Sequence, residues 1–145
     1  MKDNIILRIL AKLLIPMIIL FALYVQFHGD YSPGGGFQAG VIFSAAFILY
    51  TLVFGVDTAE RVIPERTLRV IASLGVLVYA GTGLDALIMG GEFLNYSKLV
   101  SDSVSGQHIG IILVELGVGM TVSSVMLLIF FTFANRGRPE GNDHD

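Results

Sequence analysis

The sequence contains no cysteine, which excludes disulfide bonds, thiolate metal sites and cysteine nucleophiles. Charged residues are also scarce, making up 14% of the 145 residues against 54% hydrophobic residues, and the mean hydropathy is +0.75. An ordinary soluble domain carries about 25% charged residues, so this composition predicts a small integral membrane protein instead. No basic patch is present, and we therefore expect no nucleic-acid partner.

Motifs for catalysis and cofactor binding are missing as well. The glycines at 34–36 are not followed by the Gly-Lys-Ser/Thr of a phosphate-binding loop, and no paired-histidine metal motif or nucleophile elbow occurs. No combination of nucleophile, base and oxyanion donor is visible. We therefore expect a protein that is not an enzyme and that holds no metal and no cofactor.

What the sequence does have is four long apolar runs, each close to the roughly 20 residues that a spanning helix needs. The expected fold is an all-α membrane protein with four transmembrane helices over residues 5–27, 37–55, 68–89 and 109–134, followed by a polar tail at 136–145. The first run is expected to stay as a spanning helix, because no small-residue cleavage site leads from it into a soluble domain. Pro16 is expected to kink it.

Basic residues predict the orientation, since Lys and Arg near span ends stay preferentially in the cytoplasm. Only Lys98 falls on one side of the predicted membrane; the other side has Lys2, Arg8, Lys12, Arg61, Arg66, Arg69, Arg136 and Arg138. Both termini are therefore expected to be cytoplasmic, with the 57–69 connection inside and the 90–107 loop outside.

Residues 28–40, which we call the hinge, form a glycine-rich polar segment between the first two runs. Pro33 and Gly34 suit the centre of a type II turn. Non-helical backbone at membrane depth must be covered by protein or by a water-filled cavity, so the hinge is expected to have neighbours. The residues expected to form this structural hinge and its interface are Pro33, Gly34, Gly35, Gly36, Phe37 and Gly40.

Small residues at four-residue spacing mark the faces through which membrane helices pack. Such faces are predicted at Gly36, Gly40 and Ser44, at Gly81 and Thr82, and at Gly119 and Ser123. Two acids, Asp85 and Glu115, lie beside them. A carboxylate within the membrane costs at least about 2.5 kcal/mol and is by default a functional site. Two interpretations stay open for these acids: they handle ions, or they tie helices together.

Two histidines, His28 and His108, fall at the expected outer ends of the first and fourth spans, where imidazole can relay protons near neutral pH or simply lie at the interface. Together with Asp85 and Glu115 they are the candidate ion-pathway residues. We hypothesise that these groups form a polar vestibule on the outer side.

The run Pro33-Gly34-Gly35-Gly36-Phe37-Gln38-Ala39-Gly40, preceded by His28-Gly29 and set between the first two of four spans, resembles the MnhB-type subunit of the Mrp (Mnh) multisubunit sodium/proton antiporters. The resemblance covers nearly the whole chain in length and span layout. It implies a secondary transporter subunit in a prokaryotic plasma membrane that exchanges sodium ions for protons, with subunits of the A, C, D, E, F and G types as partners. Pro33 and Phe37 are the positions that the resemblance marks as most important.

In that family the large A-type and D-type subunits are thought to carry the main proton path, and the MnhB-type subunit is needed for the assembled activity. The residues agree with an accessory role, because two membrane acids without a deep lysine cannot build a continuous path across a bilayer. Two alternatives stay open at this point. The chain is a homologous subunit of a membrane-bound hydrogenase or another redox-driven ion pump, or it is a purely structural scaffold.

Overall fold

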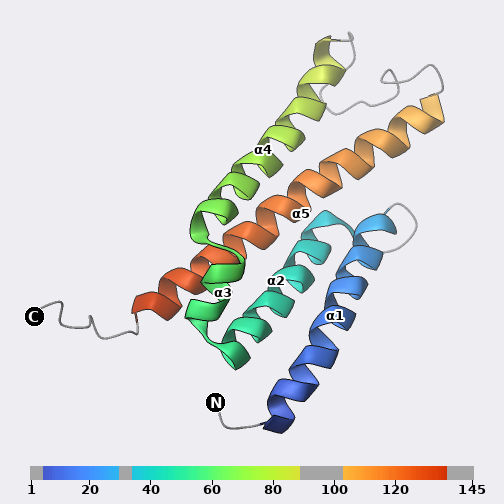
Figure 1. The fold of residues 1–145 in the computed structure, drawn as a ribbon. Helices are drawn as coiled ribbons and strands as arrows, with labels where there is room; N and C mark the ends of the chain where they lie inside the picture. Colours follow the sequence, from blue (N-terminus) through green and yellow to red (C-terminus); the bar gives the residue numbers. More distant parts are fainter. Residues whose placement is uncertain (1–4, 30–33, 89–102, 137–145) are drawn as a thin grey trace, which may run out of the picture.

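The computed structural model describes residues 5–29, 34–88 and 103–136. Within these ranges the chain forms helices and no strand (Figure 1). The helices are α1 (Ile5–Phe27), α2 (Gly36–Phe54), α3 (Val56–Val62), α4 (Glu65–Ile88) and α5 (Ser103–Arg136). The all-α fold expected from the sequence is confirmed.

In the described part of the chain, four helices are long and apolar enough to cross a membrane, as the sequence predicts. The segments that qualify are Ile5–Phe27, Gly36–Phe54, Glu65–Asp85 and His108–Arg136. The remaining helix, α3, has 7 residues and falls well short of the roughly 20 that a span requires.

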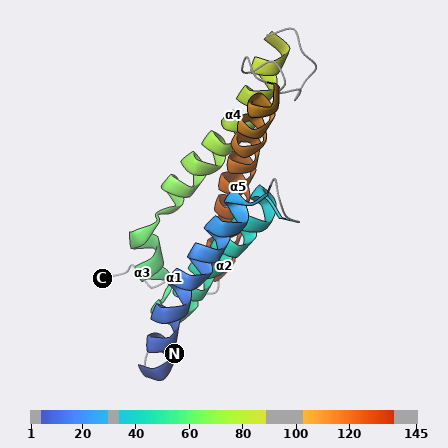
Figure 2. The same ribbon diagram turned by 90° about the vertical axis from the view of Figure 1, so that its right-hand side faces the viewer.

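The long helices lie in the spatial order α1, α2, α5, α4 (Figure 1). Helix α5 packs against α2 on one side and against α4 on the other, while α1 packs mainly against α2. Figure 2 shows the same row turned by 90°, with α1, α2 and α5 overlapping along the line of sight. Every other long helix is therefore positioned through α5, either directly or through α2.

Helix α5 is longer than the apolar run that predicts it. It has 34 residues and begins at Ser103, whereas the expected span begins at residue 109. Residues 103–108, which read Ser-Val-Ser-Gly-Gln-His, lower the local hydropathy although they are helical, so the helix begins before the apolar run does. At 1.5 Å per residue α5 is about 51 Å long, which exceeds the roughly 30 Å of a bilayer's hydrocarbon core.

A short helix occupies part of the connection expected between the second and third spans. Gly55 ends α2 with a φ of 96°, a left-handed conformation that glycine adopts without steric cost. Its backbone N–H donates to the Thr51 carbonyl at 2.9 Å, and its own carbonyl accepts from the Ala59 N–H at 3.2 Å. The chain thus changes direction at one residue and continues at once into α3.

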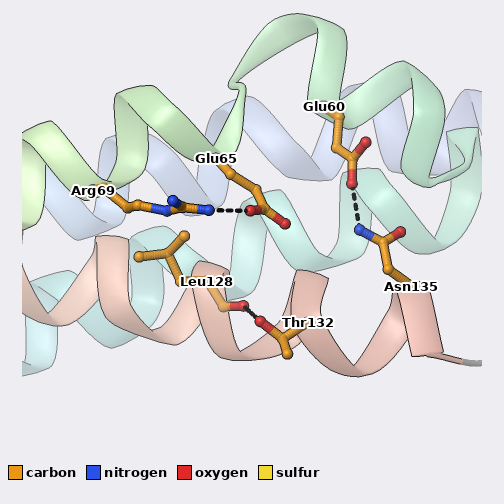
Figure 3. A network of polar contacts seen from close by, with 6 residues as sticks. All are labelled: Glu60, Glu65, Arg69, Leu128, Thr132 and Asn135. Atoms are coloured by element: carbon orange, nitrogen blue, oxygen red, sulfur yellow. Dashed lines mark hydrogen bonds and ion pairs between the residues drawn. The ribbon is translucent and has the colours of Figure 1, made fainter.

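The buried apolar core lies where α3, α4 and α5 meet, and its members are Ala59, Leu68, Leu127 and Phe131. A polar contact beside this core joins α3 to the end of α5, because Asn135 Nδ2 donates to Glu60 Oε1 at 2.8 Å (Figure 3). Within α4, Arg69 pairs with Glu65 at 2.7 Å. Helix α3 is held to α5 by both apolar packing and a hydrogen bond.

Phe131 and Phe133 provide a matched test of this core, because they lie two residues apart and are 1% and 67% exposed. Phe131→Ala is expected to lower the free energy of unfolding by about 3–5 kcal/mol, since it leaves a cavity among α3, α4 and α5. Phe133→Ala is expected to cost far less. Thermal unfolding of the detergent-purified protein followed by circular dichroism measures both, and equal melting temperatures would contradict the assignment of the core.

Candidate functional site

The Glu115 side chain lies against the hinge glycines. A methyl group added at Gly29 would overlap the Glu115 carboxylate, and one added at Gly35 would lie 2.9 Å from Glu115 Oε1. At Gly36 the added atom would overlap the backbone carbonyl of Glu115 itself. Three hinge glycines therefore make room for one residue of α5, and the acid is half-buried as a result.

The end of α2 that meets Glu115 is its N-terminus. Gly35 precedes the first helical residue with a φ of 153° and a ψ of −171°, a region of backbone space that is almost exclusive to glycine. Its carbonyl accepts from the Ala39 N–H at 3.0 Å. Because the N-terminal end of a helix carries partial positive charge, a carboxylate at Gly35 is electrostatically favoured. The positive end of α2 thus stabilises the Glu115 carboxylate, and the carboxylate in turn stabilises the N-terminus of α2.

One helical turn further along, α2 and α5 approach closely through two more glycines. A methyl group at Gly40 would lie 2.8 Å from the Gly119 carbonyl oxygen and 3.0 Å from Val122 Cβ. One added at Gly119 would lie 3.2 Å from the Gly36 carbonyl oxygen. The predicted packing faces at Gly36, Gly40 and Gly119 are confirmed, and they meet each other.

On the opposite side of α5, the crossing with α4 centres on Gly75 and Gly117. A methyl group at Gly75 would lie 2.6 Å from the Gly117 carbonyl oxygen, and one at Gly117 would lie 3.0 Å from the Tyr79 backbone nitrogen. Thr121 Oγ1 lies in the same crossing and donates to the Gly117 carbonyl at 2.8 Å. The sequence prediction did not include these two glycines.

Of the predicted packing face at Gly81 and Thr82, Gly81 is not packed within the part of the chain that the structure describes, because a methyl group added there would meet nothing within 4 Å. Its neighbour Thr82 is buried and donates to the Tyr79 carbonyl at 2.8 Å. The face of α4 that meets α5 runs through Gly75 and Thr82, and Gly81 is turned away from it.

The four candidate ion-pathway residues lie at different places along the helices. His28 directly precedes Gly29, and its exposed ring stacks on Tyr24 at 4.2 Å between ring centres. His108 is half-buried and lies seven residues before Glu115, about 10 Å away along the α5 axis. Asp85 is exposed near the end of α4. Of these residues, His28 is the first residue of the hinge, and Glu115 packs against the hinge glycines.

Of the two hinge residues that the sequence marks as most important, Pro33 and Phe37, the structure describes only Phe37. Pro33 lies outside the described residues, as do residues 89–102 of the expected outer loop. Phe37 is on the first turn of α2 and is 63% exposed, so the described residues of this chain leave most of its side chain uncovered.

Sequence reasoning missed Gln26, a polar residue near the end of α1 that is only 8% exposed. Its side-chain oxygen lies 2.6 Å from the position of a methyl group added at Gly119, and its Nε2 has no hydrogen-bond partner among the described residues. Gln26 also lines a cavity of about 260 Å³ together with Leu23, Met120 and Ser123. The signal was available, because a lone glutamine within an apolar run is costly in a membrane unless protein covers it.

Comparison with known proteins identifies the family. Residues 6–128 match the sequence profile described as "Domain related to MnhB subunit of Na+/H+ antiporter". The chain belongs to the MnhB family. The proteins named as antiporter subunit mnhB2 in Staphylococcus aureus strains Newman and COL are each 35% identical to it over 138 residues, covering 92% of this chain and 97% of theirs. The resemblance stated from the hinge is therefore confirmed.

Gly36 and Gly81 give a matched pair of substitutions for the helix crossing. Gly36→Ala is expected to destabilise the protein by about 1–3 kcal/mol or more, because the new methyl group meets the Glu115 backbone, which cannot move aside as a flexible side chain can. Gly81→Ala fills open space and is expected to be nearly neutral. Melting temperature and the amount of protein recovered from membranes report the difference; equal loss in both variants would argue against the α2–α5 crossing.

Proposed function

We propose that this MnhB-family chain is an integral subunit of a multisubunit sodium/proton antiporter, that the complex needs it for assembly, and that Glu115 lines an outer access path for ions. The observation that carries the last part is the placement of the Glu115 carboxylate against Gly29 and Gly35, where α1 gives way to α2. An acid held at a break between two spans is accessible from one membrane surface without crossing the whole bilayer.

The proposal assigns transport to the assembled complex and not to this chain alone. The α2 span contains no ionisable acid or base, and Glu115 and Asp85 are separated onto α5 and α4. A proton or cation path across a bilayer requires a continuous series of such groups. Other subunits, of the A, C, D, E, F and G types, are proposed to supply the rest, with sodium ions and protons as the transported species.

The exposed surface of α1 supports membrane embedding among other subunits. Ile9, Leu13 and Leu20 are 62%, 63% and 66% exposed within this chain. Apolar area of this extent is covered by lipid or by a partner protein. We place the chain in a prokaryotic plasma membrane as a multi-pass protein with both termini in the cytoplasm, on the basis of its basic residues and of its bacterial relatives.

A second function, that of a structural scaffold, is favoured by one observation. The backbone of Glu115, and not only its carboxylate, packs against Gly36. On this view the acid anchors the N-terminus of α2 and never meets a moving ion.

Replacing Glu115 by glutamine separates the two functions. Glutamine keeps the size of the side chain and its packing but removes the negative charge. If Glu115 handles ions, Glu115→Gln is expected to lower cation-driven proton exchange in membrane vesicles by about tenfold or more, equal to roughly 1.4 kcal/mol, with normal assembly of the complex. Activity is measured with a pH-sensitive dye, and assembly by co-purification of the other subunits.

Two further variants control this experiment. Asp85→Asn removes an acid from the exposed surface of α4, so it reports whether any loss of charge in this subunit lowers exchange. Gly29→Ala leaves Glu115 intact but displaces its carboxylate. Normal exchange in an assembled Glu115→Gln complex would reject the ion-access proposal and leave the scaffold function, while the antiporter assignment itself would stand.

The absence of cysteine makes the orientation directly testable, since one introduced thiol is the only one in this chain. Thr58 on α3 and His28 beside the hinge are both exposed. In intact cells a membrane-impermeant maleimide is expected to label His28→Cys but not Thr58→Cys, and permeabilised cells are expected to show labelling of both. Labelling of Thr58→Cys alone in intact cells would reverse the proposed orientation.

A further inference from the structure

The face of α4 that is turned away from α5 carries a groove of about 350 Å³ at the end nearest α3. Its lining residues are Arg66, Arg69, Val70, Ser73, Leu74 and Leu77. All of them come from α4, so no other described helix of this chain covers the groove. The site is independent of Glu115 and of the hinge.

The charged end of the groove has more positive than negative charge. Arg69 pairs with Glu65 at 2.7 Å, yet its side chain remains 70% exposed. Arg66 is exposed and forms no ion pair with any residue that the structure describes. This end of the groove therefore has two guanidinium groups, and the one ion pair that the structure describes there neutralises only that of Arg69. Guanidinium groups bind phosphate oxygens well, because their donors form a planar fork that matches the anion.

The remainder of the groove is apolar and extends into the span. Val70, Leu74 and Leu77 are 60%, 47% and 67% exposed, and their spacing of four and three residues places them on one face of the helix. Leu77 lies 11 positions beyond Arg66, about 16 Å along the axis. This distance is close to half of the roughly 30 Å hydrocarbon core, which is the depth of one leaflet.

The side chains on this face favour a lipid over a partner helix as the occupant. Helices in membranes associate through small residues that let their backbones approach. Gly75, Thr82 and Gly83 of α4 are buried. Gly75 packs directly against Gly117 and Thr121 of α5, whereas Ser73 is the one small residue that lines the groove. The groove presents branched apolar side chains beneath two cations instead, and an amphiphile with an anionic head and an acyl tail matches both parts.

We propose that this face of α4 binds one anionic phospholipid, with its phosphate at Arg66 and Arg69 and an acyl chain along Val70, Leu74 and Leu77. The lipid belongs to the leaflet on the α3 side of the membrane. Basic grooves at the membrane surface attract anionic headgroups in this way. The bound lipid would complete the surface of the subunit at a place where the described part of this chain supplies no neighbouring helix.

The test uses the whole complex reconstituted into vesicles of phosphatidylcholine and phosphatidylglycerol, in which one lipid at a time carries a photoreactive diazirine on its acyl chain. After irradiation, the adducts are located by peptide mass spectrometry. Phosphatidylglycerol is expected to label residues 70–77 more than phosphatidylcholine does. Arg66→Gln is expected to lower that labelling about fivefold, because each basic residue near the surface contributes modestly to anionic lipid binding.

Arg61→Gln is the matched control, because it removes the same charge from an exposed position on α3 that does not line the groove. It should leave labelling of residues 70–77 unchanged, and Arg66→Lys should retain most of it. If the Arg66→Gln complex fails to assemble, unlabelled phosphatidylglycerol is instead added to the wild-type complex as a competitor. It is expected to lower the labelling of residues 70–77 by the photoreactive phosphatidylglycerol. Equal labelling by the two lipids, or no lipid adduct on residues 70–77 because another subunit covers them, would overturn the proposal.

Discussion

The close approach of α2 to α5 is the contact on which the rest of the fold depends. At Gly36 and Gly40 the two backbones come so near that even a methyl group has no room, and such proximity gives dispersion contacts that larger side chains would prevent. Such close backbone contact matters more in a membrane than in water. Lipid tails are as apolar as leucine, so burial of apolar side chains does not drive the helices together. Helix α1 is placed through α2, and α4 through the other side of α5.

Hydropathy was sufficient to predict the number and the approximate place of the spans, because length and apolarity are what a bilayer selects for. Helix ends were less predictable. Ser103 begins α5 well before the apolar run begins, and Glu65 begins α4 three residues before the expected position 68. Helix α3 was missed because an amphipathic segment of 7 residues has too little apolarity to register as a membrane element.

The spacing of small residues in the sequence predicted the crossing of α5 with α2 but not its crossing with α4. Gly36 and Gly40 on α2, and Gly119 and Ser123 on α5, have the four-residue spacing that marks a packing face, and the two faces meet. Gly117 and Thr121 of α5 have the same four-residue spacing but were not included in the prediction, while the α4 side of this crossing pairs Gly75 with the large Tyr79, which no small-residue pattern marks. The candidate site, too, was predicted only in part. Glu115 was found because a membrane acid is conspicuous, whereas the link between Glu115 and Gly29 depends on a turn of the chain that brings together residues far apart in the sequence.

The length of α5 has a mechanical consequence. Glu115 and Asn135 are 20 residues apart on one uninterrupted helix, about 30 Å along its axis; Glu115 contacts the hinge near the middle of α5, and Asn135 contacts α3 near its C-terminal end. A helix of this kind behaves as a stiff lever. Glu115 lies only two to four residues from the crossing glycines Gly117 and Gly119, so a tilt of α5 about these crossings would move the hinge contact little and would displace the Asn135 end, with α3, much further.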